Sequence, residues 1–283
     1  MSERPRNSSP SPAELPRTVV PQDVYDDHYF RGVCLGAEEW SATGGAHVAG
    51  VYTGVLQRAG LQPGETVVDI GTGRGELLAV AVEMGASRAI GLEYAEAAIG
   101  LARQTLDTHD AKDKACVLVA DARAIPVSSE SADLVTMIDV VEHLAPNELA
   151  LTLSEAHRIL RPGGRIIIHT MPSRTIYQVT YRLLRLMRPR RWQTWPADPR
   201  NEYERSMHVN EQTVTALGRS LRKAGFDPHR VSLGRWVYTV HVPEERAKRA
   251  YHRLAKIPFL ARFGIGDIWG EGVKPASKRS SSA

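Results

Sequence analysis

Cysteine is scarce in this chain, whose 283 residues include only Cys34 and Cys116. Two cysteines so far apart in the sequence suit neither a disulfide framework nor a metal cluster, and a reduced, cytoplasmic setting is the default for such a chain. The sequence also lacks a run of 18 apolar residues and, near its start, the apolar core of a signal peptide. We therefore expect no membrane-spanning helix and no cleaved leader.

A strong excess of one charge is also missing. Lys and Arg number 36 against 32 Asp and Glu, a net charge of +4. So small an imbalance does not indicate a nucleic-acid partner, and none is expected. Hydrophobic residues make up 42% of the chain, enough for one large α/β domain with elaborations or for two small domains.

Short apolar runs alternate with helical patterns along much of the chain. We expect strands at 67–70, 89–93, 116–120, 133–138 and 165–169, and a final pair at 231–233 and 236–242. The expected helices are 47–59, 76–84, 95–106, 147–160, 176–188 and 211–224, with Asn147 and Asn210 as N-caps. Repeated β-α units of this length predict a parallel sheet with right-handed crossovers.

The first expected strand runs into a glycine-rich turn, Gly71-Thr72-Gly73-Arg74-Gly75. Glycines in the pattern G-x-G-x-G let the backbone turn tightly and approach a ligand where any Cβ would collide. The dinucleotide fingerprint G-x-G-x-x-G has its third glycine one residue later, where this chain carries Glu76. The spacing disfavours a nicotinamide site, although a strand–glycine–helix junction can also be a purely structural turn.

Acidic side chains follow four of the expected strands: Asp69, Glu93, Asp121 and Asp139. Rossmann-like sheets bind ligands at the carboxyl ends of their strands, where the strand order reverses. A single acid at a strand end is usually a helix cap or a loop residue. Four of them in register, behind the glycine turn, indicate a ligand site.

Three stretches carry a family pattern. Residues 67–75 resemble motif I of the class I S-adenosyl-L-methionine (SAM) methyltransferases, 133–144 resemble motif IV, and Leu160-Arg161-Pro162-Gly163-Gly164 resembles the later L-x-P-G-G turn. The resemblance covers residues 63–170, and its E-H-L ending is similar to the small-molecule, type 11-like branch of ubiquinone-type, sugar and natural-product enzymes. It implies an α/β Rossmann-like methyltransferase fold, with a mostly parallel seven-stranded sheet, helices on both faces, a cap inserted after the fifth strand, and SAM as the cofactor.

The resemblance also implies a role for each cofactor residue. The glycine turn would approach the methionine half of SAM, and Asp69 would orient the turn or contact the cofactor amine. Glu93 would accept hydrogen bonds from the ribose hydroxyls, Tyr94 would lie against the adenine, and Asp121 with Ala122 would take the adenine amino group. The predicted cofactor-binding residues are Asp69, Gly71, Thr72, Gly73, Gly75, Glu93, Tyr94, Asp121, Ala122 and Asp139.

Histidines near the ends of strands are candidate bases. Methyl transfer to a hydroxyl needs a group that takes its proton, and histidine suits neutral pH. His143 leads because the family's E-H-L position faces the transferring methyl group, and Glu142 would orient it or bind a metal, although no metal site is predicted. His169 and His208 are the other candidates. Glu142 and His143 could equally cap the following loop, and His169 could simply close a buried strand.

The segments outside the core are assigned by composition. Proline and serine predict a disordered arm at 1–22, followed by a helical cover at 23–62. After the SAM-binding core at 63–170 and a cap, 210–243 would complete the sheet. Residues 244–274 are expected to form a basic amphipathic segment, and 275–283 a disordered tail.

The cap, residues 171–209, is too long to be a simple connection. Its stretch 174–205 holds eight arginines against three acids. In the expected helix, apolar side chains share one face and arginines another. Three interpretations stay open: a lid with solvated arginines, an interfacial helix on anionic lipid, or recognition of an anionic acceptor. Peripheral contact with the inner face of a membrane would involve 175–192 and 244–263.

The sequence predicts methyl transfer from SAM to a small-molecule, glycan or lipid-linked acceptor, with a hydroxyl favoured. N- or C-methylation is an alternative, because all three use the same cofactor half-site. A nucleic-acid methyltransferase is less favoured, since the N/D-P-P-Y/F turn is missing and Cys116 lies within a strand. A nicotinamide oxidoreductase shares the fold, but the glycine spacing counts against it. A SAM-binding subunit without activity would lack the candidate histidines. The oligomeric state is not indicated.

Overall fold

A seven-stranded sheet forms the centre of the computed structural model, which describes residues 15–187, 195–235 and 266–276 together with Arg249, Arg253 and Ile257. The strands are β1 (Thr66–Ile70), β2 (Arg88–Glu93), β3 (Ala115–Val119), β4 (Ala132–Ile138), β5 (Leu160–Thr170), β6 (His229–Leu233) and β7 (Ile268–Val273). Their order is β3-β2-β1-β4-β5-β7-β6. Every neighbouring pair is parallel except those of β7, which is antiparallel to β5 and β6. The predicted mostly parallel, Rossmann-like sheet is confirmed.

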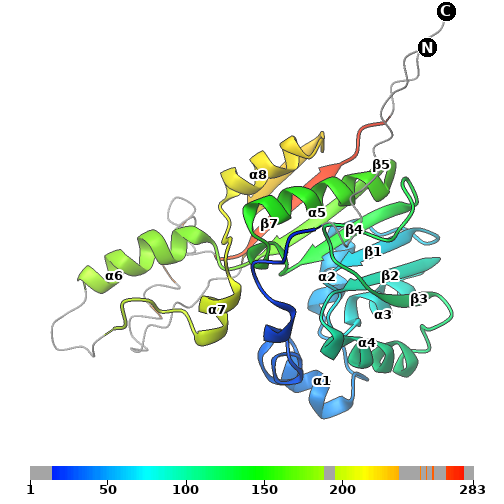
Figure 1. Cartoon of the computed structure of the whole chain (residues 1–283), viewed down its shortest axis with the longest axis horizontal. Coiled ribbons are helices and arrows are strands. Elements are labelled where there is room, and N and C mark those ends of the chain that lie inside the picture. The colour runs from blue at the N-terminus through cyan, green and yellow to red at the C-terminus, as the bar shows by residue number, and fades with distance from the viewer. Residues whose placement is uncertain are drawn as a thin grey trace, which may run out of the picture.

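Helices cover both faces of this sheet (Figure 1). They are α1 (Ala37–Thr43), α2 (Val51–Arg58), α3 (Glu76–Glu83), α4 (Glu96–Thr108), α5 (Pro146–Ile159), α6 (Arg182–Met187), α7 (Glu202–Met207) and α8 (Val214–Lys223). Short helical turns complete the chain: η2 (Gln22–Val24), η3 (Tyr29–Val33), η4 (Val141–His143) and η5 (Ile176–Tyr181).

The apolar core divides along the two faces of the sheet. Successive residues of a strand point to opposite faces, so Val67 packs with residues of α2 and α3, whereas Val68 packs with residues of α5 and α8. Because β1 is buried on both faces, it reads as a nearly continuous apolar run, as is typical of parallel strands in α/β proteins. This pattern made the central strands predictable.

The register brings the functional ends of the strands to one edge. Ile70 of β1 lies opposite Leu92 of β2 and Met137 of β4. Gly71 and Glu93, which follow directly, and Asp139, two residues after Met137, therefore lie at the carboxyl edge of the sheet. The strand order reverses between β1 and β4, which is the position at which such sheets bind ligands.

The end of the sheet differs from the prediction. The strand predicted at 236–242 lies outside the described residues, and the seventh strand is β7 at Ile268–Val273, within the segment assigned to a basic amphipathic stretch. Alternating burial along β7, with Ile268, Gly270 and Gly272 buried, lets it pair between β5 and β6. Residues 266–273 contain three glycines and two acidic residues. Because such residues are rare in strands, the sequence pattern did not predict β7.

Two predicted helix caps are also corrected. Asn147 lies inside α5, which begins at Pro146, and the Glu148 carboxylate accepts a hydrogen bond from the backbone N–H of Ala145 at 2.8 Å. Helix α8 begins at Val214, where the side chain of Thr213 accepts from the N–H of Ala216. Asn210 therefore caps no helix and is free for another role.

The N-terminal region contradicts part of the predicted disorder. Residues 15–22 lie in the arm assigned to disorder, yet Val20 is 3% exposed and the N–H of Val19 donates to Glu148 Oε1 at 2.9 Å. Further on, Phe30 and Trp40 pack with Ala98 and Leu101 of α4. The chain from about residue 18 therefore lies on the core.

Candidate active site

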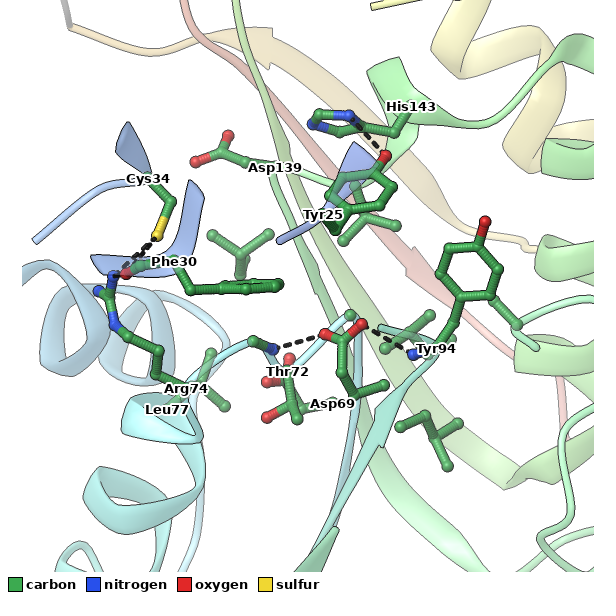
Figure 2. Close-up of a pocket in the computed structure, with 18 of the residues that line it drawn as sticks. Tyr25, Phe30, Cys34, Asp69, Thr72, Arg74, Leu77, Tyr94, Asp139 and His143 are labelled. Carbon is green, nitrogen blue, oxygen red and sulfur yellow. Dashed lines mark hydrogen bonds between the residues drawn. The ribbon is translucent and has the colours of Figure 1, made fainter. Parts of the chain in front are cut away.

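A cavity of about 230 Å³ opens at the carboxyl edge of the sheet. Its floor consists of the glycine turn after β1 and the ends of β2, β3 and β4, and its roof is the N-terminal segment from Thr18 to Leu35. Figure 2 shows Tyr25, Phe30 and Cys34 of the roof on one side and Asp69, Thr72 and Tyr94 of the floor on the other. Every predicted cofactor residue from Asp69 to Asp139 lines this cavity except Gly75, which begins α3 behind it.

The glycine turn is shaped by close approaches that only glycine permits. Gly71 has a φ of +74°, and a Cβ on it would lie 2.5 Å from Cγ2 of Val140. Gly75, with a φ of +75°, has the backbone and Cβ of Ala102 3.2 Å from where its own Cβ would be. A third glycine, Gly91 of β2, leaves room for Thr72, whose Cγ2 would otherwise lie 2.6 Å from a Cβ. The sequence analysis missed Gly91, which stands within a strand with no motif around it.

Glu93 connects the turn to β2. Its carboxylate accepts hydrogen bonds from the backbone N–H of Gly73 at 2.9 Å, Tyr94 at 2.7 Å and Ala95 at 2.8 Å. The side chain is buried, and burial raises the pKa of its carboxyl above the usual range. These hydrogen bonds fix the carboxylate, which lines the cavity and keeps a free acceptor position. The two hydroxyls of a ribose need such an acceptor for their hydrogen bonds.

Asp69 lies deeper, at the end of β1. It is 3% exposed, and Thr136 Oγ1 of β4 donates a hydrogen bond to its Oδ1 at 2.5 Å. Burial raises the pKa of this carboxyl to about 7 despite that hydrogen bond. Asp69 therefore ties β1 to β4 beneath the turn, which fits the predicted orienting role.

Asp121 is held by a residue that the sequence analysis missed. Arg123 contacts the Asp121 carboxylate through Nε at 3.0 Å and Nη2 at 2.7 Å, and its backbone N–H donates to the same group at 2.8 Å. Arg123 Nη1 also lies 3.4 Å from Glu148, the residue that holds Val19. The one sequence signal for this ion pair is the spacing Asp-x-Arg, which is too common in proteins to predict a contact.

The other end of the cavity holds the candidate bases. His143 Nδ1 and the Tyr25 hydroxyl lie 3.0 Å apart, and Figure 2 shows that hydroxyl pointing at the imidazole. Burial, with a smaller contribution from His208, lowers the pKa of His143 to about 3. The imidazole is therefore neutral at physiological pH. Tyr25 comes from the N-terminal roof, far from His143 in sequence, and no motif pointed to it.

His169, the second candidate base, lies between two carboxylates. Its Nδ1 lies 2.7 Å from Asp139 Oδ1, and its Nε2 lies 3.8 Å from Asp267. Burial alone would lower the pKa of this histidine, but the two carboxylates overcome it and raise the pKa to about 10. A raised pKa favours the protonated form of His169, which disfavours it as a base, and its predicted catalytic role stays a prediction. Asp139, with an unusual backbone φ of +54°, is fixed by this ion pair.

Comparisons with known proteins agree with this geometry. A family model described as a methyltransferase domain matches residues 45–231. The chain is 30% identical over 177 residues to a ubiquinone biosynthesis O-methyltransferase of Sinorhizobium medicae, covering 56% of this chain and 67% of that protein. It is 35% identical over 112 residues to an arsenite methyltransferase of Halobacterium salinarum, of which the match covers 28%, and 39% of this chain. A solved structure of geranyl diphosphate C-methyltransferase from Streptomyces coelicolor, with Mg²⁺, geranyl diphosphate and S-adenosyl-L-homocysteine, shares the fold with a TM-score of 0.54. It is 16% identical to this chain, and the match covers 79% of this chain and 78% of that one.

The chain belongs to the class I SAM-dependent methyltransferases. The residues of the cavity fit the cofactor of this family: the backbone cradle at Gly71 would be filled by a Cβ, and Glu93 presents a buried carboxylate. SAM is the cofactor, as the resemblance implied. Residue by residue, the predicted cofactor contacts stay predictions.

The roof of the methyltransferase cavity is fastened at three places. Tyr94 donates its hydroxyl to the carbonyl of Val20 at 2.8 Å and lies 3.0 Å from Thr18 Oγ1. Tyr25 contacts His143. Arg74, 2% exposed, donates to the carbonyls of Phe30 and Leu35, each at 2.6 Å. Arg74 stands in a variable position of the glycine motif, so the motif does not predict this contact.

Glu142 does not orient His143 in the structure. It is 1% exposed, and Thr170 Oγ1 donates to its Oε2 at 2.7 Å. Burial, reinforced by Asp139, raises the pKa of the carboxyl to about 8. Glu142, His143 and His208 each place one ligand atom within 4.8 Å of the others, so this cluster has the size of a divalent-cation site.

The last candidate, His208, lies beside His143 with ring centroids 5.0 Å apart. Within the described residues, His208 Nδ1 and Asn210 Nδ2 are buried and have no hydrogen-bond partner. Burial lowers the pKa of His208 as well. The backbone N–H groups of Val209 and Asn210 donate to the carbonyl of Glu142 at 2.9 and 3.0 Å, which joins the cap to the motif at 142–143. The structure thus brings together His143, Glu142 and His208.

Proposed function

We propose that this methyltransferase transfers a methyl group to a hydroxyl of a small-molecule acceptor: a specialised metabolite, a sugar or a lipid-linked glycan. The observation that carries the proposal is the contact of 3.0 Å between Tyr25 and His143 at the mouth of the cofactor cavity. Bound SAM supplies an electrophilic methyl group on a sulfonium. The predicted cofactor residues would hold it: the carboxylate of Glu93 would bind the ribose, and the backbone of the glycine turn would approach the methionine half.

His143 is the proposed proton acceptor. Its imidazole is neutral, so a ring nitrogen has a free lone pair throughout the neutral pH range. A hydroxyl oxygen becomes a strong acid as it gains a methyl group, so even an imidazole of lowered pKa takes its proton readily. In the proposed tautomer Nδ1–H donates to the Tyr25 hydroxyl oxygen, which fixes the ring and leaves the lone pair on Nε2 for the acceptor.

The acceptor side has further polar groups to offer. His208 Nδ1 and Asn210 Nδ2 are buried without partners in the described part of the chain. A buried polar atom without a partner costs free energy, and an oxygen-bearing acceptor would relieve that cost. These two groups are therefore proposed to bind the acceptor, while His143 acts on its hydroxyl. His208 belongs to the cap and Asn210 follows it directly, so the end of the cap would close over the acceptor.

The transfer of a labelled methyl group tests this proposal. The protein is incubated with ¹³C-methyl SAM and separate lipid, glycan and small-molecule fractions of the host, and the product is examined by NMR. The carbon chemical shift of the new methyl group distinguishes attachment to oxygen, nitrogen and carbon. We expect the labelled methyl group on oxygen. We also expect this labelling to be lost in the His143→Ala variant. Label on nitrogen or carbon that persists in that variant would overturn the hydroxyl assignment while leaving the cofactor assignment intact.

A further inference from the structure

A short helix at the edge of the molecule exposes apolar side chains. The turn η5 continues into α6, so that residues 176–187 form one helical segment. Its inner side is anchored, because Ile176, Tyr177 and Tyr181 are buried. Its outer side carries Val179, Leu183, Leu186 and Met187, which are 38%, 51%, 81% and 77% exposed. We call these four residues the α6 apolar face.

This face lies away from the cofactor cavity. In Figure 1, α6 extends outward from the body formed by the sheet and its helices. Trp195, which follows this helical segment in the sequence, is not part of the face: it is 3% exposed and stacks on Tyr181 with ring centroids 5.8 Å apart. The exposed apolar surface of α6 therefore consists of aliphatic side chains and contains no aromatic residue among the four that define it.

The charges around the face have one sign. Residues 174–195 contain six arginines and no acidic residue, although the structure does not describe 188–194. Arg182 is exposed one turn from Leu186, and Arg185 Nε donates to the carbonyl of Trp195 at 3.2 Å. Aliphatic side chains bordered by arginines suit a surface with an apolar interior and negative headgroups. A soluble acidic ligand would not need four exposed aliphatic side chains.

We propose that the α6 apolar face docks on the surface of an anionic lipid bilayer. Leu183, Leu186 and Met187 enter the region between headgroups and acyl chains, and Arg182 contacts the lipid phosphates. The helix lies on the surface rather than crossing it: among the residues that the structure describes, no helix has the length and apolar character that a membrane span requires. The proposal does not depend on which acceptor is methylated.

Vesicle flotation of the full chain tests this docking. The vesicles are pure phosphatidylcholine, or phosphatidylcholine with a third of its lipid replaced by phosphatidylglycerol, each at low and high salt. Binding is expected only to the anionic vesicles and is expected to weaken with salt. The double variant Leu186→Glu/Met187→Glu is expected to bind at least about tenfold more weakly, and Arg182→Glu about fivefold more weakly.

Matched controls separate the face from general charge and hydrophobicity. Leu151→Glu changes a partly exposed leucine of α5, and Arg103→Glu changes an exposed arginine of α4. Both are expected to float like the unsubstituted chain, and all variants are expected to keep its melting temperature and its affinity for SAM. No binding to anionic vesicles would overturn the proposal, as would equal losses in the controls. Self-association that Leu186→Glu abolishes, without any vesicle binding, would show that a second copy of the chain covers the face instead.

Discussion

The two halves of the site are built in different ways. The cofactor half is formed by backbone and by acids at the ends of β1, β2 and β3, all within residues 69–122. The proposed acceptor half consists of side chains from three distant segments: Tyr25 of the roof, His143 after β4, and His208 of the cap. The first half can be read as a motif, whereas the second exists only once the chain has folded.

Loss of His143 is expected to have the largest effect and to fall on the acceptor half alone. His143→Ala is predicted to lower turnover by at least about a hundredfold, because a positioned proton acceptor contributes that much. SAM affinity measured by calorimetry is expected to be unchanged. The control is His47→Ala, which removes an exposed histidine. Loss of turnover on adding a chelator would instead indicate that Glu142, His143 and His208 hold a metal.

A methyl group in the glycine turn is expected to damage the cofactor half. Gly71→Ala combines a left-handed φ of +74° with a Cβ 2.5 Å from Val140. Together these cost on the order of 3 kcal/mol, or about a hundredfold in SAM affinity. Gly60→Ala is the matched control, because Gly60 has a φ of +65° and open space around its Cβ position. Equal affinities of the two variants for SAM would contradict the claim that SAM binds against the backbone at Gly71.

Removal of one hydroxyl is expected to show that the roof acts through His143. Tyr25→Phe is predicted to lower turnover about tenfold, since the imidazole loses the partner that fixes its orientation. In the His143→Ala background the same change is expected to have almost no further effect, because coupled residues are not additive. Steady-state kinetics of the unsubstituted chain, the two single variants and the double variant gives the four values of this double-mutant cycle. An additive loss would place Tyr25 in an independent role.

The smallest effect is a pH dependence of stability at the border of the two halves. The folded pKa of His169 is raised to about 10, so its ion pair with Asp139 stabilises the fold fully below about pH 6.5. That stabilisation is lost as the pH rises towards 10. Urea unfolding is expected to show stability falling from pH 7 to 10, and a weaker fall in His169→Gln. Identical pH profiles would show that the pair contributes nothing.

The comparison explains what could be predicted. Buried parallel strands and the glycine spacing leave local signatures, so β1 to β5 and most of the residues that line the cavity between Asp69 and Asp139 could be named from sequence. Strand β7 could not, because Gly270, Glu271 and Gly272 mask it. Arg74, Arg123 and Tyr25 were missed because their partners are set by tertiary contacts. The ion pairs of His169 could not be predicted either, since Asp139 and Asp267 lie close to it only in the fold.

Titration of the unsubstituted chain with SAM and, separately, with NAD⁺ tests the central claim most directly. The two halves of the site require one SAM site per chain, and the glycine spacing disfavours the dinucleotide. Isothermal titration calorimetry is therefore predicted to show saturable one-to-one binding of SAM and no binding of NAD⁺. Binding of NAD⁺, or no heat with SAM, would contradict the account.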